Sequence, residues 1–158
     1  MIRRATPADA PAILAMGRAP AVESPKYREK GFDEARLMAL GERLSGTLLA
    51  ENPDACVLVA ERAGEVIGMM IPVVAERFFS GELFVTDLTL YLKPEHRGGL
   101  AFARLVRAAE DWARQRGVLD CNFGVSTEIH PERTVRAYKG LGYTLTGYTL
   151  TKKLTDGN

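Results

Sequence analysis

Apolar residues follow two different periods along this chain, and the change of period separates helices from strands. A helix that begins at Asp33 and ends near Glu51 is predicted by apolar residues at helical spacing: Leu37, Leu40, Leu44 and Leu48. From residue 56 the sequence changes to apolar runs typical of strands, CVLVAERAGEVIGMMIPVV and ELFVTDLTLYLKP. Helical spacing returns after Gly99 and, for a shorter stretch, after Pro131. These patterns together predict a mixed α/β chain.

Turn and cap residues fix the expected ends of the elements. Ile2 to Arg4 forms a first strand, and Thr6-Pro7 opens a helix that we expect to end near Arg18. A hairpin turn is expected at Ala63-Gly64. VLDCNFGVST is interpreted as a fifth strand, and YTLTGYTLTKKL as two short strands around Gly147. The predicted order is β-α-α-β-β-β-α-β-α-β-β, a central, mostly antiparallel mixed sheet of about seven strands flanked by four helices.

Length and composition restrict the class of protein. A chain of 158 residues suits a single domain, which we expect to span residues 1–158. The formal net charge of +1 and the lack of a basic stripe argue against a nucleic-acid partner. The N-terminal MIRRATPADA has no apolar stretch of a signal peptide, and no run approaches the ~20 residues of a membrane span. Cys56 and Cys121 lack metal-ligand spacing. We therefore expect a cytoplasmic protein with no membrane partner and no metal.

The stretch KPEHRGGLAFARL, residues 93–105, places two glycines where a helix begins. Glycine costs a helix about 1 kcal/mol relative to alanine, so the pair needs a reason. One interpretation is a tight corner between strand and helix. The other is an anion site from Arg97 to Ala103, where small residues let a phosphate reach the free N–H groups of a helix start. Neither a Walker A loop nor a GxGxxG fingerprint is present.

The neighbourhood of these glycines resembles a signature of the GNAT superfamily of acyl-CoA-dependent N-acyltransferases. That signature is a strand ending near a proline, then R/Q-x-x-G-x-G/A, then a long helix. The sequence LYLKPEHRGGLAFARLVRAAEDWA matches it at Arg97, but Leu100 and Phe102 occupy the two later glycine positions. A side chain at position 102 that points away from the core would crowd the phosphates.

A second stretch, RAYKGLGYTL, resembles the tyrosine motif of the same superfamily. Tyr138 is followed four residues later by Gly142 and then by Tyr143, as in that motif, although Pro131 replaces the asparagine that often opens it. With the element order, the likeness covers nearly the whole chain. The resemblance implies a GNAT-like single domain and an N-acetyltransferase that uses acetyl-CoA and a primary amine, with direct attack of the amine on the thioester.

The resemblance also implies which residues do the chemistry. Tyr138 matches the tyrosine that protonates the leaving thiolate, and a phenol with a pKa near ~10 carries its proton at neutral pH. Asp87 is the candidate base, on a strand whose alternation places it on one face with Thr89 and Tyr91. A salt bridge or a solvent-facing position would explain Asp87 equally well. His130 is the rival base, because histidine titrates near neutrality, and a water molecule is the third possibility.

The same resemblance assigns residues to acetyl-CoA. The backbone near the end of the fourth strand would bind the pantetheine arm and the thioester, and the glycine turn would bind the pyrophosphate. Lys139, with Arg136, is a candidate for the 3′-phosphate or an ordinary surface charge. The expected cofactor-binding residues are Leu90, Tyr91, Leu92, Arg97, Gly98, Gly99, Leu100, Ala101, Phe102, Ala103 and Lys139.

The sequence says less about the site that binds the acceptor amine. The resemblance places the first two helices and the segment APAVESPKYREKGFDEARL around the acceptor, where Glu23 is either a ligand for a cationic amine or a solvated charge. The acceptor is a small-molecule amine or a protein amine, and a homodimer is possible. The alternative function is an acyl-CoA-binding or sensing module of the same fold that has lost catalysis.

Overall fold

The fold is taken from a computed structural model, which describes residues 1–30, 33, 35–36, 39 and 54–154. The predicted helix from Asp33 to Glu51 falls almost entirely outside these residues. Nothing in the described part of the chain is a helix both long enough and apolar enough to cross a bilayer.

One antiparallel sheet forms the centre of the molecule. Its four strands run in the order β1 (Ile2–Arg4), β2 (Leu58–Arg62), β3 (Glu65–Glu76) and β4 (Leu83–Leu92). The predicted hairpin turn between β2 and β3 is confirmed: Ala63 and Gly64 both have positive φ, at 51° and 79°. Two successive residues of this kind give the turn that matches the twist of a hairpin.

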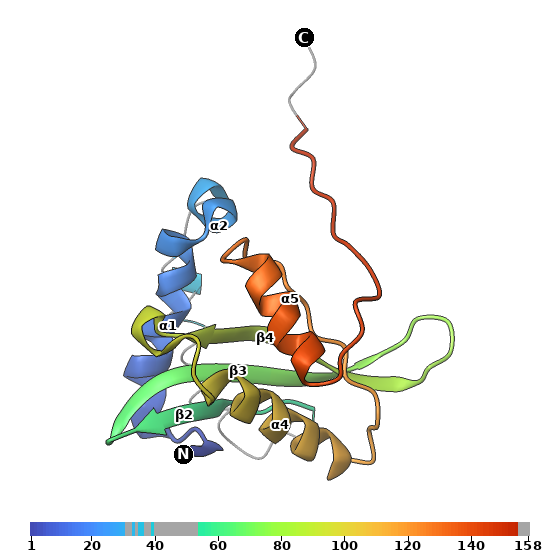
Figure 1. Cartoon of the computed structure of the whole chain (residues 1–158), viewed down its shortest axis with the longest axis horizontal. Coiled ribbons are helices and arrows are strands. Elements are labelled where there is room, and N and C mark those ends of the chain that lie inside the picture. The colour runs from blue at the N-terminus through green and yellow to red at the C-terminus, as the bar shows by residue number, and fades with distance from the viewer. Residues whose placement is uncertain (31–32, 34, 37–38, 40–53, 155–158) are drawn as a thin grey trace.

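Four α-helices are described. They are α1 (Ala10–Glu23), α2 (Pro25–Lys30), α4 (Ala101–Arg114) and α5 (Pro131–Gly140), with short 3₁₀ turns η1 (Pro7–Asp9) and η3 (Pro94–His96). The first helix runs past the predicted end near Arg18. Pro20 does not stop it, since the Pro20 carbonyl still accepts a hydrogen bond from the N–H of Ser24. The helices cover both faces of the sheet (Figure 1).

Each face of the sheet has its own apolar cluster. On one face, Leu105 and Trp112 of α4 pack with Met70 and Val85 of the sheet. On the other face, Ile13 and Met16 of α1 pack with Val57, just before β2, and with four sheet residues: Val59, Met69, Ile71 and Tyr91. The predicted α/β class, with helices packed on a central sheet, is thus what the chain adopts.

The prediction of about seven strands is wrong for the described residues, since the sheet has four. Residues 118–127 form only an isolated parallel bridge, Val85 to Cys121, and residues 143–154 form no strand. The bridge consists of two hydrogen bonds of 2.8 Å, from Val85 N to the Asp120 carbonyl and from Asn122 N to the Val85 carbonyl. Both segments have strand-like composition, but the pairing described for them is limited to this one bridge.

A β-bulge in β4 changes which side chains share a face. Asp87 pairs with Pro72 and Thr89 pairs with Ile71, so Leu88 has no partner and is exposed. The expected face with Asp87, Thr89 and Tyr91 is therefore wrong. Val85 belongs to the cluster under α4, whereas Tyr91 belongs to the cluster under α1. Asp87, two residues after Val85 in regular strand, lies on the α4 side.

Candidate functional site

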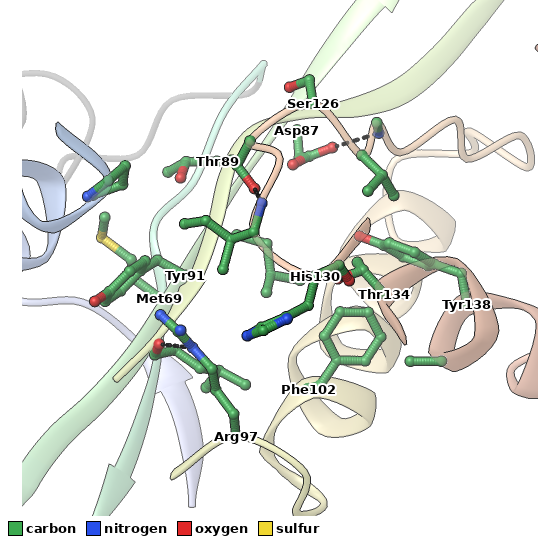
Figure 2. Close-up of a pocket in the computed structure, with 18 of the residues that line it drawn as sticks. Met69, Asp87, Thr89, Tyr91, Arg97, Phe102, Ser126, His130, Thr134 and Tyr138 are labelled. Carbon is green, nitrogen blue, oxygen red and sulfur yellow. Dashed lines mark hydrogen bonds between the residues drawn. The ribbon is translucent and has the colours of Figure 1, made fainter. Parts of the chain in front are cut away.

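A cavity of about 780 Å³ lies between the outer edge of β4, the N-terminal end of α4, α5 and α1. Residues 124–127 and 129–130 close it on the side of α5. Figure 2 shows labelled side chains from these elements directed into the space. Most of the predicted site residues line this cavity: Asp87, Leu90, Tyr91, Leu92, Arg97, Gly98, Gly99, Phe102, Ala103 and Tyr138.

The two predicted catalytic residues approach each other across the cavity. Tyr138 is buried on α5 and turns its hydroxyl into the space (Figure 2). Burial raises the pKa of Tyr138 well above its usual range, and the negative charge of Asp87 adds to that increase. The phenol therefore keeps its proton and is available as a donor.

Asp87 is held at the point where β4 and the segment 120–124 separate. Its Oδ1 accepts a hydrogen bond of 3.2 Å from the Gly124 N–H (Figure 2). Burial raises the pKa of Asp87 above its ordinary value, while the bond from Gly124 opposes the increase. A carboxylate with a raised pKa is a stronger proton acceptor than a free one, which suits general base catalysis.

The ring of Tyr138 is fixed by other aromatic rings. Phe102 meets it edge-to-face at 4.9 Å between ring centroids, and Tyr143 meets it at 5.3 Å. Phe102 is also packed against the apolar cluster under α4. Phe102 stands at a position where the signature that this stretch resembles has glycine. Its side chain therefore orients the ring of Tyr138, the candidate acid, and also lines the cavity.

The glycine turn at the start of α4 contains one glycine that the backbone requires. Gly98 has φ of +88°, whereas Gly99 lies outside the left-handed region. A Cβ atom on Gly98 would lie 2.5 Å from Nη2 of Arg133, and a Cβ atom on Gly99 would meet nothing within 4 Å. Both glycines line the cavity, but Leu100 is exposed and, like Ala101, does not.

Arg97 is already engaged within the protein. Its Nε donates to the Leu92 carbonyl at 2.9 Å, and its Nη2 donates to Oε2 of Glu23 at 2.7 Å. The other oxygen of Glu23 accepts a hydrogen bond from the Tyr91 hydroxyl. Burial and this contact with Glu23 raise the pKa of Tyr91 to about 12. Both oxygens of Glu23 have partners, so its charge serves Arg97 and Tyr91.

The end of β4 offers free backbone to the cavity. The hydrogen bonds described between β4 and the segment 120–124 reach no further than Asp87, and Leu90, Tyr91 and Leu92 line the space beyond. The sequence resemblance assigned this stretch of backbone to a pantetheine arm, and within it the Leu92 carbonyl is already bonded to Arg97. Lys139 and Arg136 are exposed and do not line the cavity.

Several lining residues were not predicted. Arg133 lies against Gly98, and Ser126 and Thr127 form part of the wall beside α5. His130, the rival base, also lines the cavity, and Figure 2 shows its imidazole directed toward Arg97 and Phe102. The start of the short helix at Pro131 was recognised from the sequence, but the contact of Arg133 with the glycine turn joins distant segments and has no sequence signal. No group of three or more metal-ligating side chains occurs in the part of the chain described.

The chain is similar to known proteins in its sequence pattern and in its fold. A family model described as "Acetyltransferase (GNAT) family" matches residues 22–143. A search of curated proteins finds no match. Among solved structures, a transcriptional regulator from Bacillus halodurans is similar with a TM-score of 0.74 and 20% identity, over 98% of this chain and 99% of that one.

Two further solved structures carry names that mention acetylation. AAC(6')-Iy, in complex with the bisubstrate analogue CoA-S-monomethyl-acetylneamine, has a TM-score of 0.75 and 14% identity, over 99% of this chain and 98% of that one. A ribosomal-protein-alanine N-acetyltransferase from Brucella melitensis has a TM-score of 0.69 and 16% identity, over 98% of both chains. At such identities the likeness establishes a shared fold.

Proposed function

This chain belongs to the GNAT family of acetyltransferases, and from that premise we propose that it transfers an acetyl group from acetyl-CoA to a primary amine. The observation that carries the proposal is the meeting of Asp87 and Tyr138 in one cavity, between a helix start and a free strand edge. Each of these features has a separate use in acyl transfer.

The glycine turn and the start of α4 suit the phosphates of the donor. The first N–H groups of a helix have no partner within it, and the helix dipole adds about half a positive charge there. Gly98 and Gly99 leave the backbone accessible, and Arg133 adds a guanidinium beside them. The backbone of β4 at residues 90–92, apart from the Leu92 carbonyl that Arg97 occupies, would bind the amide groups of the pantetheine arm, which directs the thioester toward Tyr138.

The reaction needs two proton transfers that the two residues supply. Asp87 takes a proton from the ammonium group of the acceptor, directly or through water, and the amine nitrogen attacks the thioester carbonyl carbon. A tetrahedral oxyanion forms and collapses with loss of the carbon–sulfur bond. Tyr138 donates its proton to the departing thiolate, and the second proton of the nitrogen, lost as the amide forms, returns to the Tyr138 phenolate. Asp87 releases its proton to solvent, so that an amide, free CoA thiol and the starting enzyme result. No covalent enzyme intermediate is required.

The acceptor would occupy the part of the cavity next to α1 and α2. Ile13, Leu14 and Tyr27 line this part and make it largely apolar. Since Glu23 is bound to Arg97 and Tyr91, Asp87 is the carboxylate that the described lining of the cavity offers to an ammonium group. The names of similar structures mention both a neamine derivative and a ribosomal protein, so small-molecule and protein amines are both acceptor classes to test.

The proposal is tested by thiol release from acetyl-CoA with a panel of amines, alongside acetyl-CoA binding by calorimetry. We expect amine-dependent thiol release that is lost when Asp87 and Tyr138 are both replaced, as Asp87→Asn and Tyr138→Phe. Binding of acetyl-CoA without turnover on any amine would favour the alternative, an acyl-CoA-binding module. Absence of binding by the folded protein would contradict both functions.

A further inference from the structure

The part of the cavity next to α1 is lined by apolar side chains. One stripe of α1 at helical spacing faces it: Ile13, Leu14, Gly17, Pro20 and Ala21. On the side of the sheet, Met69 and Ile71 of β3 complete the lining, and both are buried. None of these side chains carries a charge or an N–H or O–H group. A ligand in this space is therefore bound through its apolar area.

The stripe contains two residues that a helix does not favour. Glycine and proline in a helix interior cost about 1 and about 3 kcal/mol relative to alanine. Gly17 and Pro20 both lie inside α1, and both line the cavity. Because Gly17 has no side chain, it leaves room beside Leu14 and Ala21 for an apolar group that the protein itself does not supply.

The charges around the cavity suit an acceptor with a single ammonium group. Asp87 is the one acidic residue among the described lining residues, whereas Arg97 and Arg133 are positively charged. Near α2, Lys26 adds another positive charge, and its Nζ donates to the Ser126 carbonyl at 3.1 Å. A second ammonium group on the acceptor would therefore meet apolar surface or a like charge, both of which cost free energy.

Two walls of the acceptor part are joined to each other. Ser24, between α1 and α2, is fully buried, and its hydroxyl donates to the Thr127 carbonyl. Together with the bond from Lys26 to Ser126, this contact ties the junction of the two helices to the opposite wall. Ser126, Thr127 and Tyr27 of α2 themselves line the cavity. The junction therefore bounds the acceptor part on this side, which favours a small molecule over a segment of a protein.

We propose that the acceptor is a small primary amine with one positive charge and an apolar body of alkyl or aromatic carbon. The ammonium group lies at Asp87, and the apolar body extends along the stripe of α1 toward Tyr27. Polyamines, amino sugars with several ammonium groups and protein amines are then poor acceptors. The inference rests on the proposed acetyl transfer and names the substrate class for it.

Two amines of equal length test the requirement for a single charge. Pentylamine and 1,4-diaminobutane differ only in a methyl group against a second ammonium group. With acetyl-CoA as donor, we expect kcat/KM for pentylamine to exceed that for 1,4-diaminobutane by about tenfold or more. It should exceed that for propylamine by a similar factor, since an apolar pocket discriminates by about tenfold or more per methylene. An equal or higher kcat/KM for the diamine, or for a short peptide with a free α-amine, would overturn the inference.

A new carboxylate on α1 tests where the apolar body binds. Leu14→Glu places the charge in the lining, and Ala15→Glu is the matched control, because Ala15 is exposed and outside the described lining. We expect the preference for pentylamine over 1,4-diaminobutane to fall by about tenfold or more in Leu14→Glu and to stay unchanged in the control. If Leu14→Glu does not fold, Leu14→Ala replaces it, with an expected loss for pentylamine alone. A preference that survives the change at Leu14 would overturn the placement.

The outcomes separate this inference from the proposed function. Transfer to other amines with none to pentylamine would overturn the apolar acceptor and leave acetyl transfer standing. No transfer to any amine would contradict the proposed function, and calorimetric affinities of the two amines for the protein saturated with CoA would then decide, with equal affinities overturning the inference. A higher rate with hexanoyl-CoA and propylamine than with acetyl-CoA and pentylamine would assign the apolar space to the acyl chain and overturn it too.

Discussion

The guanidinium of Arg97 lies 2.7 Å from the carboxylate of Glu23, which joins the glycine turn before α4 to the last residue of α1. Both side chains are about three-quarters buried, and the Tyr91 hydroxyl completes the group. Arg97 also bonds the carbonyl of Leu92, so it closes the end of β4 as well. Arg97 was expected to bind a phosphate, but its hydrogen bonds connect the glycine turn to the ends of α1 and β4.

Replacement of Arg97 by alanine should therefore lower the free energy of unfolding, by about 1–3 kcal/mol, because it removes two hydrogen bonds and leaves Glu23 without its cation. Glu23→Gln keeps one acceptor oxygen for Arg97, and its amide N–H can donate to the Tyr91 hydroxyl, so this change should cost less. Urea denaturation of the three proteins measures both effects. If Arg97→Ala retains full stability while acetyl-CoA binding is lost, Arg97 serves the phosphate, and its bonds to Glu23 and Leu92 do not stabilise the fold.

The two glycines of the turn should differ when each is replaced by alanine. Gly98→Ala forces a side chain into positive φ and against Arg133, so we expect a loss of about 1 kcal/mol or more in the free energy of unfolding. Gly99→Ala is the matched control, since its Cβ atom meets no atom within 4 Å and its φ is ordinary. The midpoint of thermal unfolding compares the two variants, and equal midpoints would contradict a special role of Gly98.

Local features of the fold were predictable from the sequence, and pairings between distant segments were not. The hairpin at Ala63-Gly64 and the helices α4 and α5 follow from turn residues and spacing that lie within a few positions of one another. Strand-like composition, by contrast, indicates that a segment can form a paired strand, but not which strand edge is available to it. Residues 118–127 and 143–154 were for that reason predicted as strands that the described structure does not contain.

In the candidate site, too, local features were predictable and contacts between distant segments were not. Tyr138 was predicted from a motif and Asp87 from its place on a strand, and the structure brings them into one cavity. The bulge at Leu88, which moves Asp87 to the α4 side, depends on pairing with β3 and has no signal in β4 alone. The bond between Glu23 and Arg97 spans 74 positions, so only the folded chain reveals that Glu23 is occupied.

Tyr138→Phe should lower turnover by a factor of about 10²–10⁴, the usual contribution of a positioned acid, with little change in acetyl-CoA affinity. Phenylalanine keeps the ring contacts with Phe102 and Tyr143 and removes only the proton donor. Tyr143→Phe is the control from the same aromatic group, because the Tyr143 hydroxyl bonds Glu110 outside the cavity. Steady-state rates of thiol release and calorimetric affinities separate the two effects. Equal rates for Tyr138→Phe and the unmodified protein would remove Tyr138 from the chemistry.

Asp9 should control stability in acid. Its buried carboxylate accepts two hydrogen bonds from Arg3, at 2.7 and 2.9 Å, and one from the Thr6 N–H at 2.7 Å. The bonds from Arg3 hold the pKa of Asp9 far below its usual range, against the effect of burial. A carboxyl with a depressed pKa stabilises the fold above its unfolded pKa, near ~3.9, and this contribution is lost as the pH falls further.

Asp9→Asn should accordingly cost about 1–3 kcal/mol at pH 7 and progressively less at lower pH. Glu82→Gln is the control, because the Glu82 side chain is exposed and its ion pair with Arg77 is long, at 3.8 Å. Urea denaturation between pH 7 and pH 3 gives the free energies. A difference between Asp9→Asn and the unmodified protein that stays constant over this range would show that protonation of Asp9 does not contribute.

Asp87 offers a test in which activity and stability should move in opposite directions. Because burial raises its pKa, the folded chain binds a proton more readily than the unfolded chain, and stability contributed by Asp87 falls as the pH rises from the unfolded value through the raised value. At neutral pH the charged carboxylate therefore opposes folding. Asp87→Asn keeps an acceptor for the Gly124 N–H and should unfold at a higher temperature than the unmodified protein at pH 7.

The same substitution should remove the acidic limb of the pH–rate profile. In the unmodified protein, kcat/KM should fall as the pH drops through the raised pKa of Asp87, since only the carboxylate accepts a proton. Asp87→Asn should lower kcat/KM by a factor of about 10² or more and leave a flat profile in that region. His130→Ala, the rival base, should keep the limb because its imidazole is directed toward Arg97 and Phe102. A limb that survives in Asp87→Asn and disappears in His130→Ala would transfer the role of base to the histidine.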